Sequence, residues 1–289
     1  MPRGASMLNA LTVDVEDYYH VSAFESVVRF ADWERFESRV EKNTDTVLAL
    51  FDEQHVKATF FVLGWVAERY PQLVRRIVVE EHEVACHGYR HRRIYTMTPQ
   101  EFRHDTRKAK QLIEAAAGTA VLGYRAASYS ITSQSLWALE ILAEEGFQYD
   151  SSIFPIRHDL YGIPHHQRFF HRIHGNGSQS LAEFPLSTVR LAGVNLPVAG
   201  GGYLRLFPYF VTHLAMRRLN HLERQPAVVY FHPWELDPDQ PRIQARWKSR
   251  FRHYTNMHRM EAKIRTLLSN FSFAPIREVY AAHLHYGAK

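Results

Sequence analysis

The stretch Glu-Val-Ala-Cys-His-Gly-Tyr-Arg-His at residues 83–91 is the part of the sequence that best indicates the fold. Its short apolar run is typical of a buried strand that ends at His87, and Gly88 allows the backbone to turn there. His91 follows four residues after His87. If a helical turn begins at Gly88, both imidazoles lie on one face, where one Zn²⁺ could bind both nitrogens.

The spacing of the two histidines is not specific by itself. With 18 histidines in 289 residues, about one His-x-x-x-His pair is expected by chance, and this is the only one in the sequence. A metal site therefore requires a carboxylate and a general acid from other parts of the chain.

The composition indicates a globular chain whose length suits one large domain. The formal charge of +5 permits an anionic glycan, a membrane surface or nucleic acid as partner. Basic residues cluster at 217–218 and 242–252 and are interpreted as a solvated face; they form no recognised nucleic-acid motif, so no nucleic-acid partner is predicted. The single cysteine, Cys86, excludes an internal disulfide and is predicted to be a buried core thiol.

The N-terminal residues lack the basic and apolar segments of a signal peptide, and no apolar run is long enough to span a bilayer. We therefore expect a cytoplasmic location, including the inner-membrane face. Residues 1–6 are predicted to be a disordered lead or an expression remnant, and residues 7–289 to form one domain. A homo-oligomer is compatible with the sequence.

Strands alternate with helices along most of the chain, which predicts a mostly parallel sheet covered by helices, open or closed into a barrel. Strands are predicted at 7–15, 57–63, 83–86, 120–124, 147–150, 181–186 and 227–231, and helices at 43–54, 71–81, 98–118, 133–145, 208–222 and 257–268. The helix after Thr98 has a capping box, with proline at its first position and Gly118 at its end. Residues 155–180 show no period and are predicted to form a long loop.

Ionisable residues fall at the carboxyl ends of five predicted strands, where parallel α/β barrels carry their chemistry. They are Asp14, His87, Arg125, Asp150 and His232. Each alone is more typical of a turn or a salt bridge, but their convergence predicts an active site.

The acidic segment Asp14-Val-Glu-Asp17 could complete a metal site. A catalytic zinc site typically has three protein ligands and one open position, so two histidines and one carboxylate fit. A second, unligated carboxylate can take a proton from the bound water. Strand alternation places Asp14 and Glu16 on one face, and Asp17 becomes available if the chain turns after Val15, so Glu16 and Asp17 both remain candidate ligands.

His232 is a candidate general acid. It follows an apolar strand and precedes Pro233, which ends the strand, so its imidazole is expected to face the mouth of the fold. Histidine suits this role because its pKa lies near working pH. A purely structural histidine at the end of the strand is the alternative.

Taken in order, these residues resemble the polysaccharide deacetylases with NodB homology, carbohydrate esterase family 4. The resembling motifs are Asp14-Val-Glu-Asp17 for the aspartate pair, His87 and His91 for the histidine pair, residues 124–129 (Tyr-Arg-Ala-Ala-Ser-Tyr) for the arginine motif, and residues 231–233 (Phe-His-Pro) for the late histidine. Residues 14–19, 150–155 and 252–257 are similar to the bacterial branch found with exopolysaccharide and exosortase gene clusters. That branch has a DUF3473-type C-terminal region and is similar to Helicobacter peptidoglycan deacetylase and PuuE-type allantoinase.

The resemblance implies a metal-dependent amide hydrolase, an α/β protein with a distorted (β/α)7 barrel and a family-specific extension at residues 235–289 packed on the barrel. It implies Zn²⁺, or another divalent transition metal, held by His87, His91 and either Glu16 or Asp17. Asp14 would be the base, Arg125 would orient Asp14 and keep it ionised, and His232 would protonate the departing sugar amine. Candidate substrate contacts are Tyr89, Tyr129, Asp150, Ser151, Glu183, Tyr203 and Trp234.

Two positions depart from the family pattern. Val15 stands where many members have the metal-binding aspartate, which leaves the choice between Glu16 and Asp17 open. Ala127 stands where proline is common in the arginine motif, which puts the rigidity of that loop and its substrate contacts in question.

The leading hypothesis is hydrolytic removal of acetyl from an N-acetylhexosamine in a bacterial exopolysaccharide or its lipid-linked precursor. One alternative is a PuuE-like hydrolase of a small cyclic amide, with or without a metal. Another is a catalytically inactive glycan-binding scaffold. Retention of Asp14 and His232 argues against the scaffold, because binding alone needs neither a base nor an acid.

Overall fold

The strands of the chain build one large sheet and one hairpin. The computed structural model describes residues 7–174, 180–198 and 200–284, so the predicted lead at residues 1–6 lies outside the described residues. The sheet has the order β10-β1-β2-β3-β4-β5-β7-β6, and β11 pairs with β1. The strands are β1 (Leu8–Val15), β2 (Thr59–Val62), β3 (Glu83–Cys86), β4 (Gly123–Tyr124), β5 (Tyr149–Asp150), β6 (His171–His174), β7 (Ser180–Glu183), β8 (Thr188–Leu191), β9 (Val194–Pro197), β10 (Val228–Phe231) and β11 (Ser272–Ala274).

The predicted α/β class with a parallel sheet is confirmed. Neighbouring strands of the large sheet are parallel, except that β6 runs antiparallel to β7. Among the described residues the strand pairing has two ends instead of forming a continuous ring. Ser187, just beyond β7, spans toward β10: its N–H donates to the Val228 carbonyl (3.4 Å), and the Val228 N–H donates to Ser187 Oγ (2.7 Å). This contact joins the segment after β7 to β10, so the sheet curves into a distorted, incompletely closed barrel.

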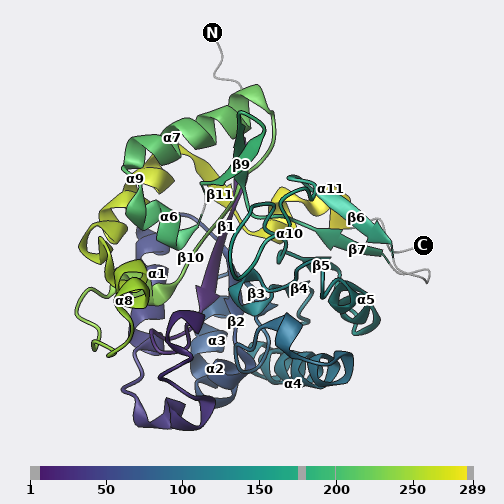
Figure 1. Ribbon diagram of the computed structural model, residues 1–289, viewed down its shortest axis with the longest axis vertical. Coiled ribbons are helices and arrows are strands. Elements are labelled where there is room, and N and C mark those ends of the chain that lie inside the picture. The colour runs from purple at the N-terminus through teal and green to yellow at the C-terminus, as the bar shows by residue number, and fades with distance from the viewer. Residues whose placement is uncertain (1–6, 175–179, 199, 285–289) are drawn as a thin grey trace.

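Helices surround the sheet (Figure 1). They are α1 (Val40–Glu53), α2 (Gly64–Arg69), α3 (Pro71–Val79), α4 (Pro99–Ala117), α5 (Trp137–Glu144), α6 (Gly201–Leu206), α7 (Tyr209–Arg217), α8 (Trp247–Tyr254), α9 (Met260–Asn270), α10 (Ile276–Val279) and α11 (Ala281–Leu284). Figure 1 shows α6, α7, α8 and α9 gathered on the side of β10, and α4 and α5 on the side of β4 and β5. In the described part of the chain, every helix is too short or too polar to cross a bilayer.

The start of α4 is fixed by neighbouring residues, whereas the start of α1 is fixed by a residue far away in the sequence. The predicted capping box of α4 is confirmed: Thr98 Oγ1 accepts from the Glu101 N–H (3.2 Å), and a Glu101 carboxylate oxygen accepts from the Thr98 N–H (2.8 Å). Helix α1, in contrast, begins at Val40, ahead of the predicted start at residue 43. Its first N–H groups are bound by Asp17, which the local sequence around residue 40 does not contain.

The register of the strands explains why distant polar residues meet. Cys86 pairs with Tyr124, and Tyr124 pairs with Asp150. The next residue on each of these strands therefore lies at the same edge of the sheet. On the other side, Val13 pairs with Phe231, which brings residues 14 and 232 to that edge as well.

Candidate active site

His87 and His91 lie in a loop after β3. The expectation of a helical turn here is wrong, because Gly88 and His91 both have left-handed backbone angles (φ +75° and +51°), which a right-handed helix excludes. The two imidazole centroids are nevertheless 5.4 Å apart. His87 Nδ1 donates to the Arg125 carbonyl (2.8 Å), so Nε2 remains free to bind a metal. Burial lowers the pKa of His87 to about 4 and keeps the ring neutral, as ligation requires.

Glu16 completes a group of three possible metal ligands with the two histidines. Their ligand atoms lie within 4.8 Å of one another, and all three residues are buried. Glu16 Oε2 is 2.9 Å from His91 Nε2, yet it accepts no well-directed hydrogen bond from any described residue. A buried carboxylate oxygen without a donor is costly. One carboxylate and two imidazoles fit a divalent transition metal with a position left open.

Asp17 has a different environment from Glu16. Its Oδ1 accepts from the Tyr18 N–H (2.9 Å), while Oδ2 accepts from Ser38 Oγ (2.9 Å) and from the N–H groups of Arg39 (2.7 Å) and Val40 (3.0 Å). These bonds direct the carboxylate toward the start of α1. Of the two candidate ligands, the structure brings only Glu16 to the histidines.

Asp14 is held between two buried side chains. Arg125 Nη1 donates to Asp14 Oδ1 (2.7 Å), and the Tyr129 hydroxyl donates to Oδ2 (3.1 Å). Burial raises the pKa of Asp14, but the charge and hydrogen bond of Arg125, together with the charge of His232, outweigh burial and hold the pKa below its usual value. The carboxylate is therefore ionised beside the possible metal ligands.

His232 lies close to the carboxylates of Asp14 and Glu16. Its Nε2 is 3.1 Å from Glu16 Oε1 and 4.0 Å from Asp14 Oδ2. Its Nδ1 is 2.6 Å from Glu235 Oε1. Burial lowers the pKa of His232, but Glu16 and Glu235 outweigh burial and raise it to about 9. The imidazole is thus protonated at neutral pH and can act as an acid.

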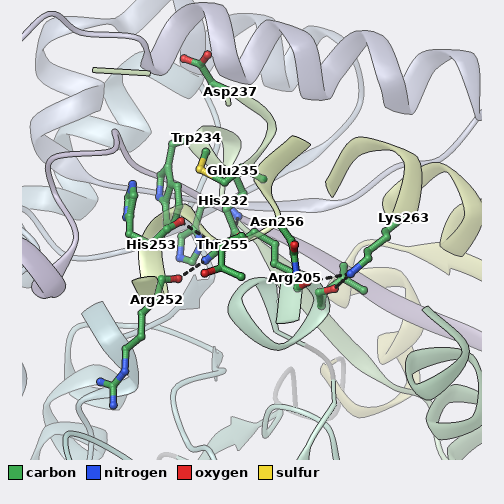
Figure 2. Close-up of polar contacts among 12 residues, drawn as sticks. Arg205, His232, Trp234, Glu235, Asp237, Arg252, His253, Thr255, Asn256 and Lys263 are labelled. Carbon is green, nitrogen blue, oxygen red and sulfur yellow. Dashed lines mark hydrogen bonds and ion pairs between the residues drawn. The ribbon is translucent and has the colours of Figure 1, made fainter. Parts of the chain in front are cut away.

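Glu235 and Arg205 are site residues that the sequence reasoning missed. Arg205 Nε donates to Glu235 Oε2 (2.6 Å), and its other nitrogens donate to carbonyls at the end of α8, those of Arg252 (3.1 Å), His253 (2.6 Å) and Thr255 (3.1 Å). Figure 2 shows this arrangement, with Arg205 beside the carbonyls of residues 252–255. The His-x-x-Glu spacing at residues 232–235 was the available signal, since it closes a capping box.

The five residues Asp14, Glu16, His87, His91 and His232 all line one cavity of about 510 Å³, within the usual range for ligand sites. Aromatic side chains also line it, namely Tyr129, Tyr161, Tyr230 and Trp234. Trp234 is stacked between His232 and His253, with ring centroids 5.1 Å and 4.1 Å away, so both of its ring faces are already covered.

The remaining predicted substrate contacts lie elsewhere. The Tyr89 hydroxyl donates to Glu68 Oε2 (2.6 Å), outside the cavity lining. Ser151 Oγ accepts from Arg125 Nη2 (2.9 Å), and so supports the arginine from behind. Glu183 is buried and accepts from the Ile153 N–H (3.0 Å), while Asp150 accepts from Ser152 (2.5 Å). Tyr203 lines a neighbouring cavity of about 410 Å³.

Comparisons with known proteins agree with this fold. The polysaccharide deacetylase family matches residues 32–149, and the domain of unknown function DUF3473 matches residues 151–281. Residues 32–149 therefore form a polysaccharide deacetylase domain of the NodB type, carbohydrate esterase family 4. A DUF3473 region follows this domain along the chain.

Three curated relatives are similar over part of their length. A peptidoglycan-N-acetylglucosamine deacetylase of Bacillus cereus is 34% identical over 98 residues (34% of this chain, 36% of the relative). A Helicobacter pylori peptidoglycan deacetylase is 33% identical over 107 residues (37% and 36%), and a Bradyrhizobium chitooligosaccharide deacetylase is 35% identical over 95 residues (33% and 43%). The chain thus matches less than half the length of each of these relatives.

Two solved structures share the whole fold. A Mycobacterium smegmatis protein classed as a polysaccharide deacetylase has a TM-score of 0.65 at 21% identity, covering 98% of this chain and 92% of its own. PuuE allantoinase has a TM-score of 0.60 at 14% identity, covering 98% and 93%. At these identities the likeness establishes the fold.

Proposed function

We propose that this chain is a metal-dependent hydrolase that removes the acetyl group from N-acetylhexosamine units of a bacterial exopolysaccharide or its lipid-linked precursor. The observation that carries the proposal is the meeting of Asp14, the Glu16–His87–His91 group and His232 in one cavity. The family membership of residues 32–149 supports the reaction class.

Glu16, His87 and His91 would hold Zn²⁺ or another divalent transition metal, which when bound supplies Lewis acidity toward the acetyl carbonyl and water. Asp14 takes the proton from the attacking water. His232 donates a proton to the amine nitrogen as the C–N bond breaks, so the products are acetate and a free amino sugar.

Arg125 and Tyr129 act through Asp14. Their two hydrogen bonds fix the orientation of the carboxylate, and the positive charge of Arg125 keeps it ionised. Glu235, itself paired with Arg205, holds His232 with its Nε2 toward the cavity. Trp234 stacks on His232 with ring centroids 5.1 Å apart and limits its rotation.

The C-terminal residues support the site from behind, in line with an extension from residue 235 that packs on the sheet. Strand β11 pairs with β1, which carries Asp14. The Ile276 N–H donates to Thr59 Oγ1 (2.8 Å) on the neighbouring strand β2. A cytoplasmic or inner-membrane location and a homo-oligomeric state stay predictions.

The size of the site favours a glycan over a small cyclic amide. The cavity of about 510 Å³ shares Tyr161, Tyr230 and Arg252 with the neighbouring cavity of about 410 Å³, so a ligand can extend from one into the other. A cyclic amide would occupy only part of this space.

The proposal is tested by measuring acetate release from chitooligosaccharides and N-acetylated bacterial exopolysaccharides, with elemental analysis of the same protein. We expect acetate release that a chelator abolishes and added metal restores. Turnover of allantoin without acetate release would favour the cyclic-amide alternative. Glycan binding without turnover in metal-loaded protein would favour the scaffold.

A further inference from the structure

One wall of the cavity comes from α8 and the residue before it. Arg246, Ser249, Arg252 and His253 line the cavity. Ser249 lies three residues before Arg252 and four before His253, which places these three on one side of α8, and Arg246 is the N-cap of the helix. The sequence interpretation of residues 242–252 as a solvated basic face therefore describes only part of this segment, since two of its arginines face the candidate site.

The positive charges of Arg246 and Arg252 have no strong ion pair with the described residues of the protein. Of the other cavity arginines, Arg205 is paired with Glu235 and Arg93 with Glu25. Arg246 has no ion pair with any described residue. Arg252 lies 3.9 Å from Asp159, a long contact between side chains that are 59% and 64% exposed, which solvent weakens. The sequence contains no aspartate or glutamate between residues 240 and 260.

Arg252 lies where the two cavities join. It lines both of them, together with Tyr161 and His158, and the second cavity adds Tyr203 and Phe251. The backbone of Arg252 is fixed, because its carbonyl accepts a hydrogen bond from Arg205 Nη2 (3.1 Å). Figure 2 shows its side chain extending away from the Arg205 contacts. A ligand that reaches from the metal-ligand residues into the second cavity passes this guanidinium.

We propose that Arg246 and Arg252 bind an oxyanion of the substrate, a sugar carboxylate or a phosphate, on the unit next to the N-acetylated hexosamine. The inference rests on the proposed function and deepens it, since it makes the substrate an acidic N-acetylated glycan. Guanidinium groups match carboxylates and phosphates in geometry and can donate two parallel hydrogen bonds. Phe251, which is 55% exposed and lines the second cavity, offers a ring face for the sugar that carries the anion.

The test compares three probes on the metal-loaded full chain. Hyaluronan tetrasaccharide carries carboxylates, UDP-N-acetylglucosamine carries a diphosphate, and chitotetraose is neutral. Isothermal titration gives the affinity for each probe, and acetate release gives kcat and KM. We expect the double variant R246Q/R252Q to lose about 10- to 100-fold in affinity for one anionic probe relative to chitotetraose, mainly through KM. The anionic probe that is affected identifies the carboxylate or the phosphate as the source.

Arg250→Gln is the matched control. Like the single variant Arg252→Gln, it removes one positive charge from α8. Arg250 lines neither cavity, so its ratio of acidic to neutral affinity is expected to stay unchanged. If Arg250→Gln lost as much affinity for the anionic probe as the single variants Arg246→Gln and Arg252→Gln, the effect would be one of long-range charge and the proposal would be overturned. An equal loss for neutral and anionic probes in the double variant would overturn it as well.

The two proposals fail in different ways. If the wild-type protein releases no acetate from any probe, the deacetylase proposal fails, while the titration still decides whether the arginines bind an anion. If R246Q/R252Q loses binding to anionic lipid vesicles but not to the acidic tetrasaccharide, the arginines serve a membrane surface and the proposal is overturned.

Discussion

His232 Nδ1 lies 2.6 Å from Oε1 of Glu235, three residues further along the chain. The carboxylate favours the charged imidazolium and contributes to a His232 pKa of about 9. Replacing Glu235 with glutamine removes the negative charge, so the pKa of His232 falls and the acid loses its proton at lower pH. We predict that the alkaline limb of the kcat/KM profile of Glu235→Gln shifts to lower pH. An unchanged alkaline limb would show that Glu235 does not tune the acid.

Gly201 is predicted to be required because Glu235 lies against it. A Cβ atom at residue 201 would stand 1.8 Å from Glu235 Oε1, so Gly201→Ala must push the carboxylate away from His232. We expect a loss of about 1–3 kcal/mol in unfolding free energy and reduced activity. Gly202→Ala is the control, since its nearest atom would be 3.9 Å away. Equal behaviour of the two variants would contradict the packing argument.

Asp17→Asn should weaken the fold and spare the metal. The amide of asparagine keeps one acceptor oxygen but turns an NH₂ group toward N–H or O–H donors at the start of α1. We expect a loss of about 1–3 kcal/mol in urea unfolding, with metal content unchanged by elemental analysis. Loss of the metal at unchanged stability would make Asp17 the ligand in place of Glu16.

Because His82 is buried, we predict that the stability of the folded protein depends on pH. Its Nδ1 accepts from the Ala58 N–H (3.1 Å), and burial, the largest effect, lowers its pKa to about 4 in the folded protein. Between that value and the unfolded pKa of about 6.5 the unfolded chain binds more protons, so stability falls as pH decreases through this window. The full effect is at most roughly 3 kcal/mol.

The measurement for His82 is the free energy of unfolding at several pH values, for wild type and for His82→Gln. The variant lacks this titration, so its curve is expected to be flatter between pH 6.5 and 4. Parallel curves would assign the acid sensitivity to other groups.

The meeting of residues 14, 87, 125 and 232 could be predicted because parallel strands end at a shared edge, and each of these residues follows an apolar run. The register of the sheet bears this out. The choice between Glu16 and Asp17 as metal ligand could not be made from the neighbouring sequence. It depends on the approach of residues 38–40, which engage Asp17.

Other elements escaped prediction for related reasons. Helix α8 has one buried residue, His253, and exposes Trp247 and Phe251, so it lacks the apolar stripe that signals a helix. Strand β6 falls within the predicted loop at 155–180, because its residues are only half-buried and show no apolar alternation. The Arg205–Glu235 contact joins residues thirty positions apart and depends on the close approach at Gly201.

In the proposed function, Glu16 and the two histidines hold a metal while His232 supplies a proton. The most direct test of this function is metal content and acetate release measured on the same preparations of wild type, Glu16→Gln and His232→Ala. We predict one metal per chain and turnover in wild type, loss of both in Glu16→Gln, and retained metal with kcat reduced about 10²- to 10⁴-fold in His232→Ala. Full turnover in His232→Ala would refute the role of His232 as the acid, and full metal content in Glu16→Gln would refute Glu16 as a ligand.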